Sequence, residues 1–286
     1  MSSLNALYSI AIKKSDQPLI IILQSIAGAL LLVLTFMGNA ISLYAGFFLV
    51  FLLVISASIH THRMVERRLV DHQRQVQSLN ELTHLLPLRA PLPPLTGWAA
   101  SPELLTQILM IVKSHQPTSV LELGSGASTI AIPYMLERWG QGSMISIDHD
   151  ADFAEKTRHN LSIHEHQNIS LHHCALRPVT VNGTGYRWYD LSQVTLPHRI
   201  DLLIVDGPPL QTNPLARYPA LPLLWDRLSD GAIILMDDTD RADEQEIVRR
   251  WMELYPITIL ERQSSLKGFL ALKVRKAETR SQPTTA

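Results

Sequence analysis

The stretch Ser119-Val-Leu-Glu-Leu-Gly-Ser-Gly-Ala-Ser-Thr129 decides the fold class of this chain. A short apolar strand leads through Gly124-Ser125-Gly126 into residues 127–139, which have the composition of a helix. Glycine has no Cβ, so it permits a tight turn between strand and helix and lets a ligand approach the backbone closely. The stretch therefore predicts a nucleotide-binding turn in an α/β fold.

Working outward from this turn, strand and helix patterns alternate. Strands are expected at 120–123, 144–148, 169–173, 201–206, 232–236, 257–262 and 269–274. Helices are expected at 101–115, 127–139, 151–164, 215–228 and 242–255. Such alternation predicts a Rossmann-like, doubly wound parallel sheet, here of seven strands. Since no helix fits between the last two strands, they should form a terminal antiparallel hairpin.

Acidic residues follow several of these strands. Asp148 ends the second strand, Asp206 the fourth, and Asp237 and Asp238 the fifth. Taken singly, each is more typical of a helix cap or a solvated loop. Carboxyl ends of parallel strands share one edge of a sheet, where ligands bind. Because like charges repel at close range, a ligand, a metal or hydrogen-bond donors must compensate them there.

The N-terminal part has a different composition. A polar tail at residues 1–16 precedes a hairpin at 17–59, whose segments 18–37 and 40–59 carry no charged residue and are joined by Gly38-Asn39. A helix of about 20 apolar residues spans a bilayer. We therefore expect a two-helix transmembrane hairpin, with a buried hairpin of a soluble protein as the alternative.

Basic residues lie only outside the hairpin, at Lys13 and Lys14 before it and at Arg63, Arg67 and Arg68 after it. The positive-inside rule then places both termini and the following domain in the cytoplasm. The spans contain no ionisable group, which favours an anchor over a transport pathway.

Beyond the hairpin, residues 60–95 read as an amphipathic helix followed by a proline-rich linker. The helix could pair with a second copy in a homodimer or lie on lipid headgroups. The catalytic domain is expected at 96–275 and a disordered tail at 276–286. A net charge of −1 gives no reason to expect nucleic acid as a partner. Cys174, the single cysteine, is interpreted as a small buried residue.

The ordered motifs resemble a known family. Glu122-Leu-Gly-Ser-Gly126, the acid ending strand two, Val205-Asp-Gly-Pro-Pro209 and the closing hairpin are similar to class I S-adenosylmethionine-dependent methyltransferases. A bacterial branch of (O-)methyltransferases with an N-terminal membrane hairpin resembles the chain more closely, through the segments 97–102, 186–190 and 216–221. The resemblance covers residues 96–275.

The resemblance implies a set of cofactor contacts. S-adenosylmethionine would lie over the glycine turn, with its amino group anchored by Glu122, its ribose held by Asp148 and its adenine flanked by His149. Family members often have a polar residue where this chain has Ala175. The implied contacts are Glu122, Gly124, Ser125, Gly126, Ser128, Asp148, His149, Ala175, Leu176 and Asp206.

The resemblance also implies catalytic and acceptor residues. Asp206, Asp237 and Asp238 occupy the positions at which catechol-type O-methyltransferases hold Mg²⁺, with Asp206 and Asp237 as the catalytic acids. Those enzymes have Asp-Asn where this chain has Asp237-Asp238, and a lysine base where it has Pro209. The alternative is that Asp206 orients a ligand and the other two cap the next helix. Acceptor contacts are expected at Arg217, Tyr218, Trp188 and Tyr189, with packing, or pairing of Arg217 with acids, as the alternative.

The leading interpretation is a methyltransferase anchored in the bacterial inner membrane by two spans, acting on the cytoplasmic side on an oxygen nucleophile. Its acceptor would be a small molecule, a lipid or a membrane protein, because tethering raises the local concentration of such molecules. Two other classes stay open. One is a nicotinamide-dependent oxidoreductase, although Thr129 replaces its third glycine. The other is a non-catalytic membrane scaffold that keeps the fold.

Overall fold

The structure is a computed structural model that describes residues 25–26, 28–29, 33, 36, 40–95, 100–263 and 268–276. The chain divides into two compact units, residues 1–73 and 74–286, which are considered separately. Several expectations fall outside the described residues: the polar tail at 1–16, the Gly38-Asn39 turn, most of the span 18–37, the segment 97–99 and the tail beyond residue 276.

The second expected span and the amphipathic helix form one helix, α3 (Ala40–Leu85). Among the residues that the structure describes, one helix is long and apolar enough to cross a membrane, over Tyr44–Leu85. Its most apolar stretch is only 6% buried. α3 ends at Leu85, two residues before Pro87, which has no N–H to continue a helix.

The last turns of α3 belong to the second unit. Leu82 and Leu86 are 1% and 3% exposed and lie in the same apolar cluster as the leucines of α4 (Pro102–His115). The hydroxyl of Thr106 in α4 donates to the carbonyl oxygen of Ser78, at 3.2 Å. The end of the expected amphipathic helix therefore packs at the edge of the domain. The apolar side chains that end α3 need a partner, and α4 supplies it.

The seven-stranded sheet is confirmed. It consists of β1 (Ser119–Leu123), β2 (Ser143–Asp148), β3 (Ile169–His173), β6 (Ile200–Val205), β7 (Leu228–Asp237), β8 (Ile257–Gln263) and β9 (Phe269–Val274). Their order is β3-β2-β1-β6-β7-β9-β8, so the strand order reverses between β1 and β6. β9 pairs antiparallel with both β7 and β8, as the terminal hairpin requires.

One hairpin was missed in the sequence. β4 (Leu176–Val181) and β5 (Thr184–Tyr189) form a separate two-stranded sheet. Its turn is Asn182-Gly183, with φ angles of 49° and 77°. Asn-Gly is the strongest short-range hairpin signal, because both residues tolerate positive φ. The hairpin stands between β3 and β6, where a crossover helix would normally lie.

The expected helix at 215–228 is wrong. The region contains only a five-residue α7 (Ala220–Leu224) and a 3₁₀ turn at Trp225–Arg227, after another at Leu210–Thr212. Pro219 and Pro222 have no N–H to donate within a helix, which limits its length. The shortened segment leaves Arg217 and Tyr218 in an irregular turn, and this turn directs Arg217 toward the strand ends.

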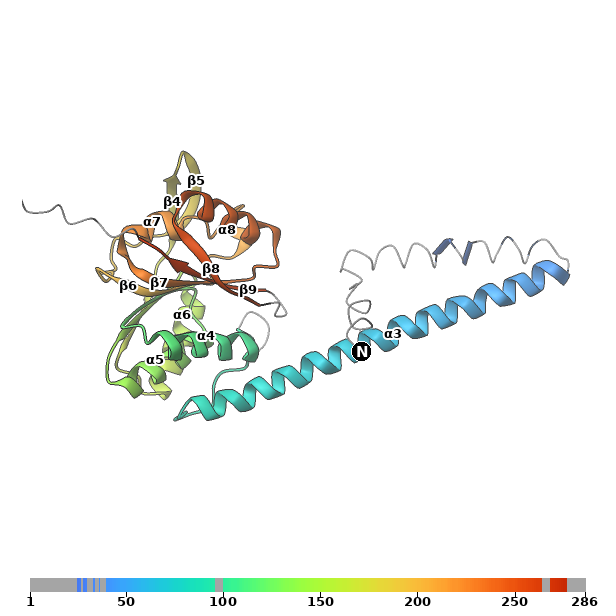
Figure 1. The fold of residues 1–286 in the computed structure, drawn as a ribbon, viewed down its shortest axis with the longest axis horizontal. Coiled ribbons are helices and arrows are strands. Elements are labelled where there is room, and N and C mark those ends of the chain that lie inside the picture. The colour runs from blue at the N-terminus through green and yellow to red at the C-terminus, as the bar shows by residue number, and fades with distance from the viewer. Residues whose placement is uncertain are drawn as a thin grey trace, which may run out of the picture. The chain divides into compact units, whose positions relative to one another are not determined.

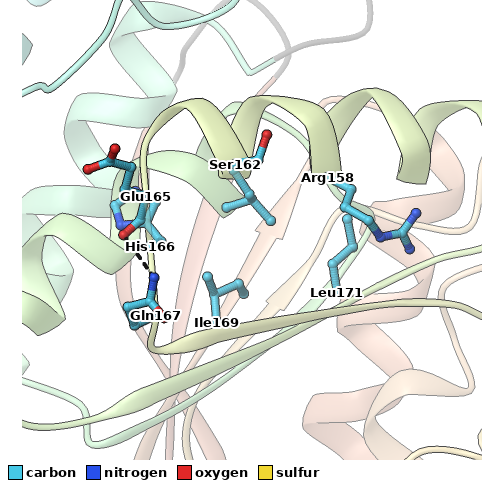
Figure 2. Close-up of a pocket in the computed structure, with 8 residues that line it drawn as sticks. Arg158, Ser162, Glu165, His166, Gln167, Ile169 and Leu171 are labelled. Carbon is cyan, nitrogen blue, oxygen red and sulfur yellow. Dashed lines mark hydrogen bonds between the residues drawn. The ribbon is translucent and has the colours of Figure 1, made fainter.

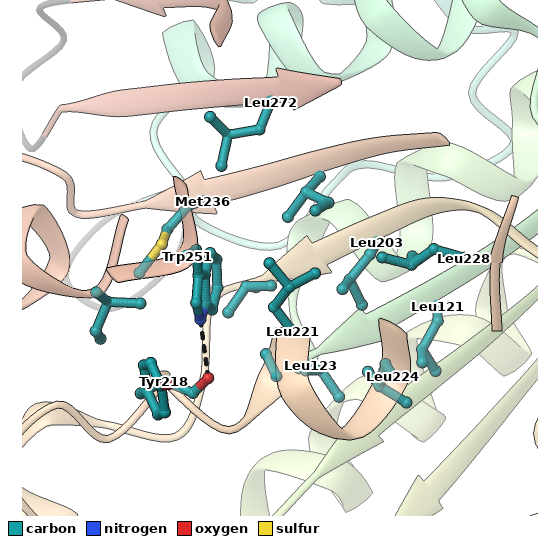
Figure 3. Close-up of a cluster of buried hydrophobic side chains, with 14 of the residues drawn as sticks. Leu121, Leu123, Leu203, Tyr218, Leu221, Leu224, Leu228, Met236, Trp251 and Leu272 are labelled. Atoms are coloured by element: carbon teal, nitrogen blue, oxygen red, sulfur yellow. Dashed lines mark hydrogen bonds between the residues drawn. The ribbon is translucent and has the colours of Figure 1, made fainter. Parts of the chain in front are cut away.

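Helices cover both faces of the sheet in the second unit (Figure 1). α4, α5 (Ala127–Trp139) and α6 (Ala151–Ile163) lie on one face. α7, α8 (Ala242–Leu254) and the β4–β5 hairpin lie on the other. Figure 3 shows the core beneath α7 and α8, where the indole of Trp251 donates to the carbonyl oxygen of Tyr218 at 3.0 Å. The sheet is thus held rigidly behind its carboxyl edge.

Candidate active site at the carboxyl ends of the strands

The glycine turn brings two strand ends together. Gly124 has φ +103°, and a Cβ there would lie 3.1 Å from the carbonyl carbon of Asp206. A side chain at this position would therefore separate β1 from β6. Gly126 differs, since a Cβ there would meet nothing within 4 Å. Its open face is where a ligand can approach the backbone.

Glu122 lies beneath the turn and is fully buried. Three hydroxyls donate to its carboxylate: Ser128 and Thr129 at 2.5 Å each, and Ser146 at 2.6 Å. Burial raises the pKa of Glu122 to about 7, although these three hydrogen bonds oppose the rise. The side chain supports the turn from inside the protein. Its expected contact with a cofactor amino group stays a prediction.

Asp148 ends β2 beside the turn. Its Oδ2 accepts from the Ser125 backbone N–H at 2.9 Å and from the Ser125 hydroxyl at 2.6 Å. Its Oδ1 accepts from the Asp150 backbone N–H at 3.0 Å. Burial pushes the pKa of Asp148 upward, but hydrogen bonds from His149, Ser125 and the Asp150 backbone outweigh it, so the pKa is lowered. The carboxylate stays charged and is fixed in orientation, as a hydroxyl-binding acid requires.

The expected adenine contacts gather next to Asp148. The Cys174 backbone N–H donates to the carbonyl oxygen of Asp148 at 2.7 Å, which holds the end of β3 against β2. Ala175 is exposed and Leu176 half-buried at this end. Cys174 itself is 4% exposed, and burial raises the pKa of its thiol to about 11, which confirms a packing role.

Tyr189 brings a polar atom into this region from β5. Its ring lies 6.4 Å from that of His149, centroid to centroid. Its buried hydroxyl has no hydrogen-bond partner among the described residues. A Cβ on Gly207 would lie 2.3 Å from that hydroxyl, so the loop after β6 passes directly over it. Burial, then the charge of Asp148, raises the pKa of Tyr189 well above its usual value, so the group is a hydrogen-bond donor.

The acids after β6 and β7 come together as the sequence predicts. One carboxylate oxygen from each of Asp206, Asp237 and Asp238 lies within 4.8 Å of the others. Asp237 and Asp238 are buried, whereas the Asp206 side chain is 34% exposed. Partial burial and the charge of Asp237 raise the pKa of Asp206 well above its usual value, against the opposing effect of Arg217. Asp206 is the acid of this cluster with open access to a ligand.

Arg217 occupies the centre of the cluster and is 3% exposed. Its Nη2 donates to Asp238 Oδ2 at 2.8 Å and lies 3.3 Å from Asp206 Oδ1. The backbone carbonyls of Asp206 and Asp237 each accept from the guanidinium at 2.9 Å. Of the two expectations for Arg217, the pairing with acids is the one that these contacts support.

These residues do not suit a divalent cation. Mg²⁺ needs carboxylate oxygens with free lone pairs and no competing positive charge. Asp238 Oδ2 already accepts from Arg217 and lies 2.9 Å from Arg241 Nη1. The guanidinium of Arg217 also stays protonated at any working pH. An ion-pair cluster therefore lies at the position of the expected metal site.

The remaining expected acceptor residues are packed in the core. Trp188 and Tyr218 are 2% and 4% exposed. The Tyr218 ring stacks on Tyr186 with centroids 5.7 Å apart, and its hydroxyl accepts from Asn182 at 3.0 Å. Both residues thus have the packing role, and their contact with an acceptor stays a prediction.

The alternative that Asp237 and Asp238 cap α8 is wrong. Arg241 occupies the cap position of that helix, with no side-chain cap hydrogen bond.

Several residues of the site were missed in the sequence. Thr129 and Ser146 bind Glu122, and Glu244 of α8 lies 2% exposed with its Oε1 3.8 Å from Arg217 Nε. Glu244 shares one helix face with the buried Ile247 and Trp251. An acid in such an apolar periodic position was the available signal for a buried charge.

A pocket on the surface lies away from this site. A pocket of about 620 Å³ is formed by α6 and β3, with Arg158, His166 and Ile169 among its lining residues (Figure 2). Ile169 begins β3, so this pocket is at the amino end of the strand, away from the carboxyl edge. The site is therefore located by the strand ends and their charges, independently of the pockets.

Comparison with known proteins supports this location. Residues 121–239 match a family profile described as a methyltransferase domain, which extends from β1 to the acids after β7. No match was found among curated proteins.

Solved structures resemble the chain at low similarity. One is an O-methyltransferase from Bacillus cereus in complex with SAH, at 14% identity and a TM-score of 0.47, covering 71% of this chain and 91% of that one. Another is the O-methyltransferase TomG from Streptomyces achromogenes in complex with SAM, at 17% identity and a TM-score of 0.47, covering 63% and 82%.

The assignment rests on the profile match, together with the strand order and the acids that the sheet brings to one edge. Both the match and the terminal antiparallel hairpin favour a methyltransferase over a nicotinamide-dependent oxidoreductase. Residues 121–239 therefore match a methyltransferase domain, and they lie in the seven-stranded sheet that is expected of a class I, S-adenosylmethionine-dependent methyltransferase.

Proposed function

We propose that this chain is a membrane-anchored methyltransferase that methylates an oxygen nucleophile at the cytoplasmic face of the membrane. The observation that carries the oxygen acceptor is the half-exposed carboxylate of Asp206, which lies beside the glycine turn with a raised pKa. An oxygen acceptor must lose a proton, and a carboxylate with a raised pKa is a competent base for it.

Different residues of this chain bind the methyl donor and remove the proton of the acceptor. When bound, S-adenosylmethionine supplies an electrophilic methyl group. Asp148 and the open backbone at Gly126 hold the donor, and the Tyr189 hydroxyl offers a further donor of hydrogen bonds. Asp206 takes the proton of the acceptor hydroxyl as the new oxygen–carbon bond forms. The electron pair of the broken sulfur–carbon bond stays on sulfur.

The membrane anchor is supported by the exposed surface of α3. Phe47, Phe48 and Phe51 are 65%, 62% and 59% exposed. Val50 and Leu52, which are 38% and 46% exposed, point to other sides of the helix. A helix that is apolar all round needs either a protein core or a bilayer to cover it. We propose the bilayer, with two spans and both termini in the cytoplasm. The acceptor would then be a lipid, a quinone-like molecule, a cell-envelope precursor or a membrane protein.

Donor binding is the first test. The full chain in detergent micelles is titrated with S-adenosylmethionine in a calorimeter, after circular dichroism has shown that it is folded. We expect one donor bound per chain. A folded protein that binds none would refute the proposal.

Acceptor chemistry is the second test. Membrane extract is incubated with the protein and with donor labelled with ¹³C in its methyl group, and the product is inspected by NMR. We expect a methoxy carbon in the lipid-soluble fraction. The variant Asp206→Asn should bind the donor normally and form no product, whereas an equal product yield would exclude Asp206 as the base.

Topology is tested by cysteine labelling in intact cells. Cys174 is buried, so background labelling should be low. We expect a membrane-impermeant maleimide to label Asn39→Cys but not Ser281→Cys. Labelling of the second variant would contradict the cytoplasmic placement.

A further inference from the structure

The acid cluster at the ends of β6 and β7 contains more carboxyl groups than guanidinium partners among the described residues. Asp206, Asp237, Asp238 and Glu244 are four carboxyl groups, and among the described residues Arg217 and Arg241 are the two guanidinium groups that form ion pairs within the cluster. In many proteins such a cluster would recruit a divalent cation. Here the guanidinium of Arg217 already occupies the centre of the cluster.

We propose that Arg217 is a built-in cation that takes the place of a divalent metal at this site and positions its carboxylates. The guanidinium is planar and has five donors in a fixed fork, so it can hold several acceptors at once. Its N–H groups donate to the carboxylate of Asp238 and to the backbone carbonyl oxygens of Asp206 and Asp237. It therefore ties β6 to β7 as a bridging metal would.

The backbone at Asp238 supports this role. Its φ is +61°, in the left-handed region that few residues other than glycine adopt. Aspartate tolerates this conformation better than most residues, but it still needs support from its surroundings. The ion pair of Asp238 Oδ2 with Arg217 and Arg241 supplies that support. The buried Oδ1 of Asp238 has no hydrogen-bond partner among the described residues, which leaves one oxygen for a cation if Arg217 is removed.

Arg217 and Arg241 differ in a way that gives a matched control. Arg217 is buried and reaches both strand ends, whereas the side chain of Arg241 is 35% exposed and, among the described residues, pairs with Asp238 and Glu244. Loss of Arg217 should therefore open the centre of the cluster, and loss of Arg241 should not. Arg217 is buried and acts through the carboxylates that it holds, so it is a positioning residue.

The test measures Mn²⁺ binding by electron paramagnetic resonance of the full chain in detergent. The wild type, Arg217→Lys and Arg241→Gln should leave the free Mn²⁺ signal at the level of empty micelles. Arg217→Gln should gain one Mn²⁺ site per chain that the wild type lacks, because removing a nearby positive charge favours a cation. Adding Asp206→Asn to Arg217→Gln should abolish that site.

Two results would overturn the inference. One is a stoichiometric Mn²⁺ bound by the wild type and lost in Asp238→Asn. The other is a folded Arg217→Gln protein that gains no site. If Arg217→Gln does not fold, the wild type decides: thermal unfolding unchanged by Mn²⁺ and by chelator supports the inference, and stabilisation by Mn²⁺ that Asp238→Asn removes refutes it. No methyl acceptor is needed, so these outcomes are independent of the proposed function.

Discussion

Two groups of acids meet at one edge of the sheet, and the protein stabilises them by different means. Glu122 and Asp148, around the glycine turn, accept hydrogen bonds from neutral hydroxyls and backbone N–H groups. Asp206, Asp237 and Asp238, after β6 and β7, surround the guanidinium of Arg217. Neutral donors leave Asp148 charged, which suits a cationic sulfonium ligand. The guanidinium neutralises the second group in part and holds it in place.

The largest loss of stability should follow from removing Arg217, the cation of the second group. Arg217→Gln leaves buried carboxylates without their cation, and breaking a buried ion pair from one side costs about 3–5 kcal/mol. We expect a correspondingly large fall in the thermal unfolding temperature of the domain, followed by tryptophan fluorescence.

The exposed neighbour supplies the control for that variant. Arg241→Gln removes a partly exposed pair and should cost about 0–1 kcal/mol. Equal losses in the two variants would show that the position of the arginine in the cluster does not matter.

The contribution of Glu122 to stability should depend on pH. The pKa of Glu122 is about 7 in the folded protein and 4.5 as its usual value. A raised folded pKa gives stability that is full below pH 4.5 and is lost as the pH rises through about 7. The loss amounts to about 3 kcal/mol for this shift. Glu122→Gln cannot titrate, so its unfolding temperature should fall less than that of the wild type between about pH 5 and about pH 8. Parallel profiles would contradict the assignment.

The affinity for S-adenosylmethionine tests the role of Asp148, the second acid at the glycine turn. Asp148→Asn keeps the shape but loses the charge, and hydrogen bonds to charged groups contribute about 1.5–3 kcal/mol. We expect calorimetry to show S-adenosylmethionine binding weakened by about tenfold to a hundredfold. Asp150→Asn is the matched control, because Asp150 caps α6 two residues away and asparagine caps equally well. A similar loss in both variants would exclude a specific role for Asp148.

The smallest effect should come from Gly126. Its φ of 177° suits any residue, and a Cβ there has open space. Gly126→Ala should therefore raise stability by about 0.4–1 kcal/mol through the unfolded state. The same methyl group should weaken donor binding, because it fills the face on which the ligand lies. Unchanged affinity would mean that the donor does not approach this backbone.

Local patterns predicted much of this molecule. Strand and helix alternation determined the seven-stranded sheet, and apolar stretches with a following proline predicted the course and end of α3. The strand ends that carry Asp148, Asp206, Asp237 and Asp238 could be read directly, because parallel strands bring their carboxyl ends to one edge. The β4–β5 hairpin was also readable from Asn182-Gly183, although Trp188 and Tyr189 at its end were interpreted as acceptor contacts.

Tertiary structure decided how the charges are satisfied. Nothing local distinguishes Arg217 from a surface arginine, because its partners lie 11, 20 and 21 residues away on two strands. The hydroxyls that surround Glu122 likewise come from β2 and α5, and no spacing rule joins them. A sequence specifies which residues carry charge and which strand they end. Whether a buried charge binds a metal, a ligand or an arginine depends on the residues that folding places around it, since the cost of burying a charge is removed only by direct contacts.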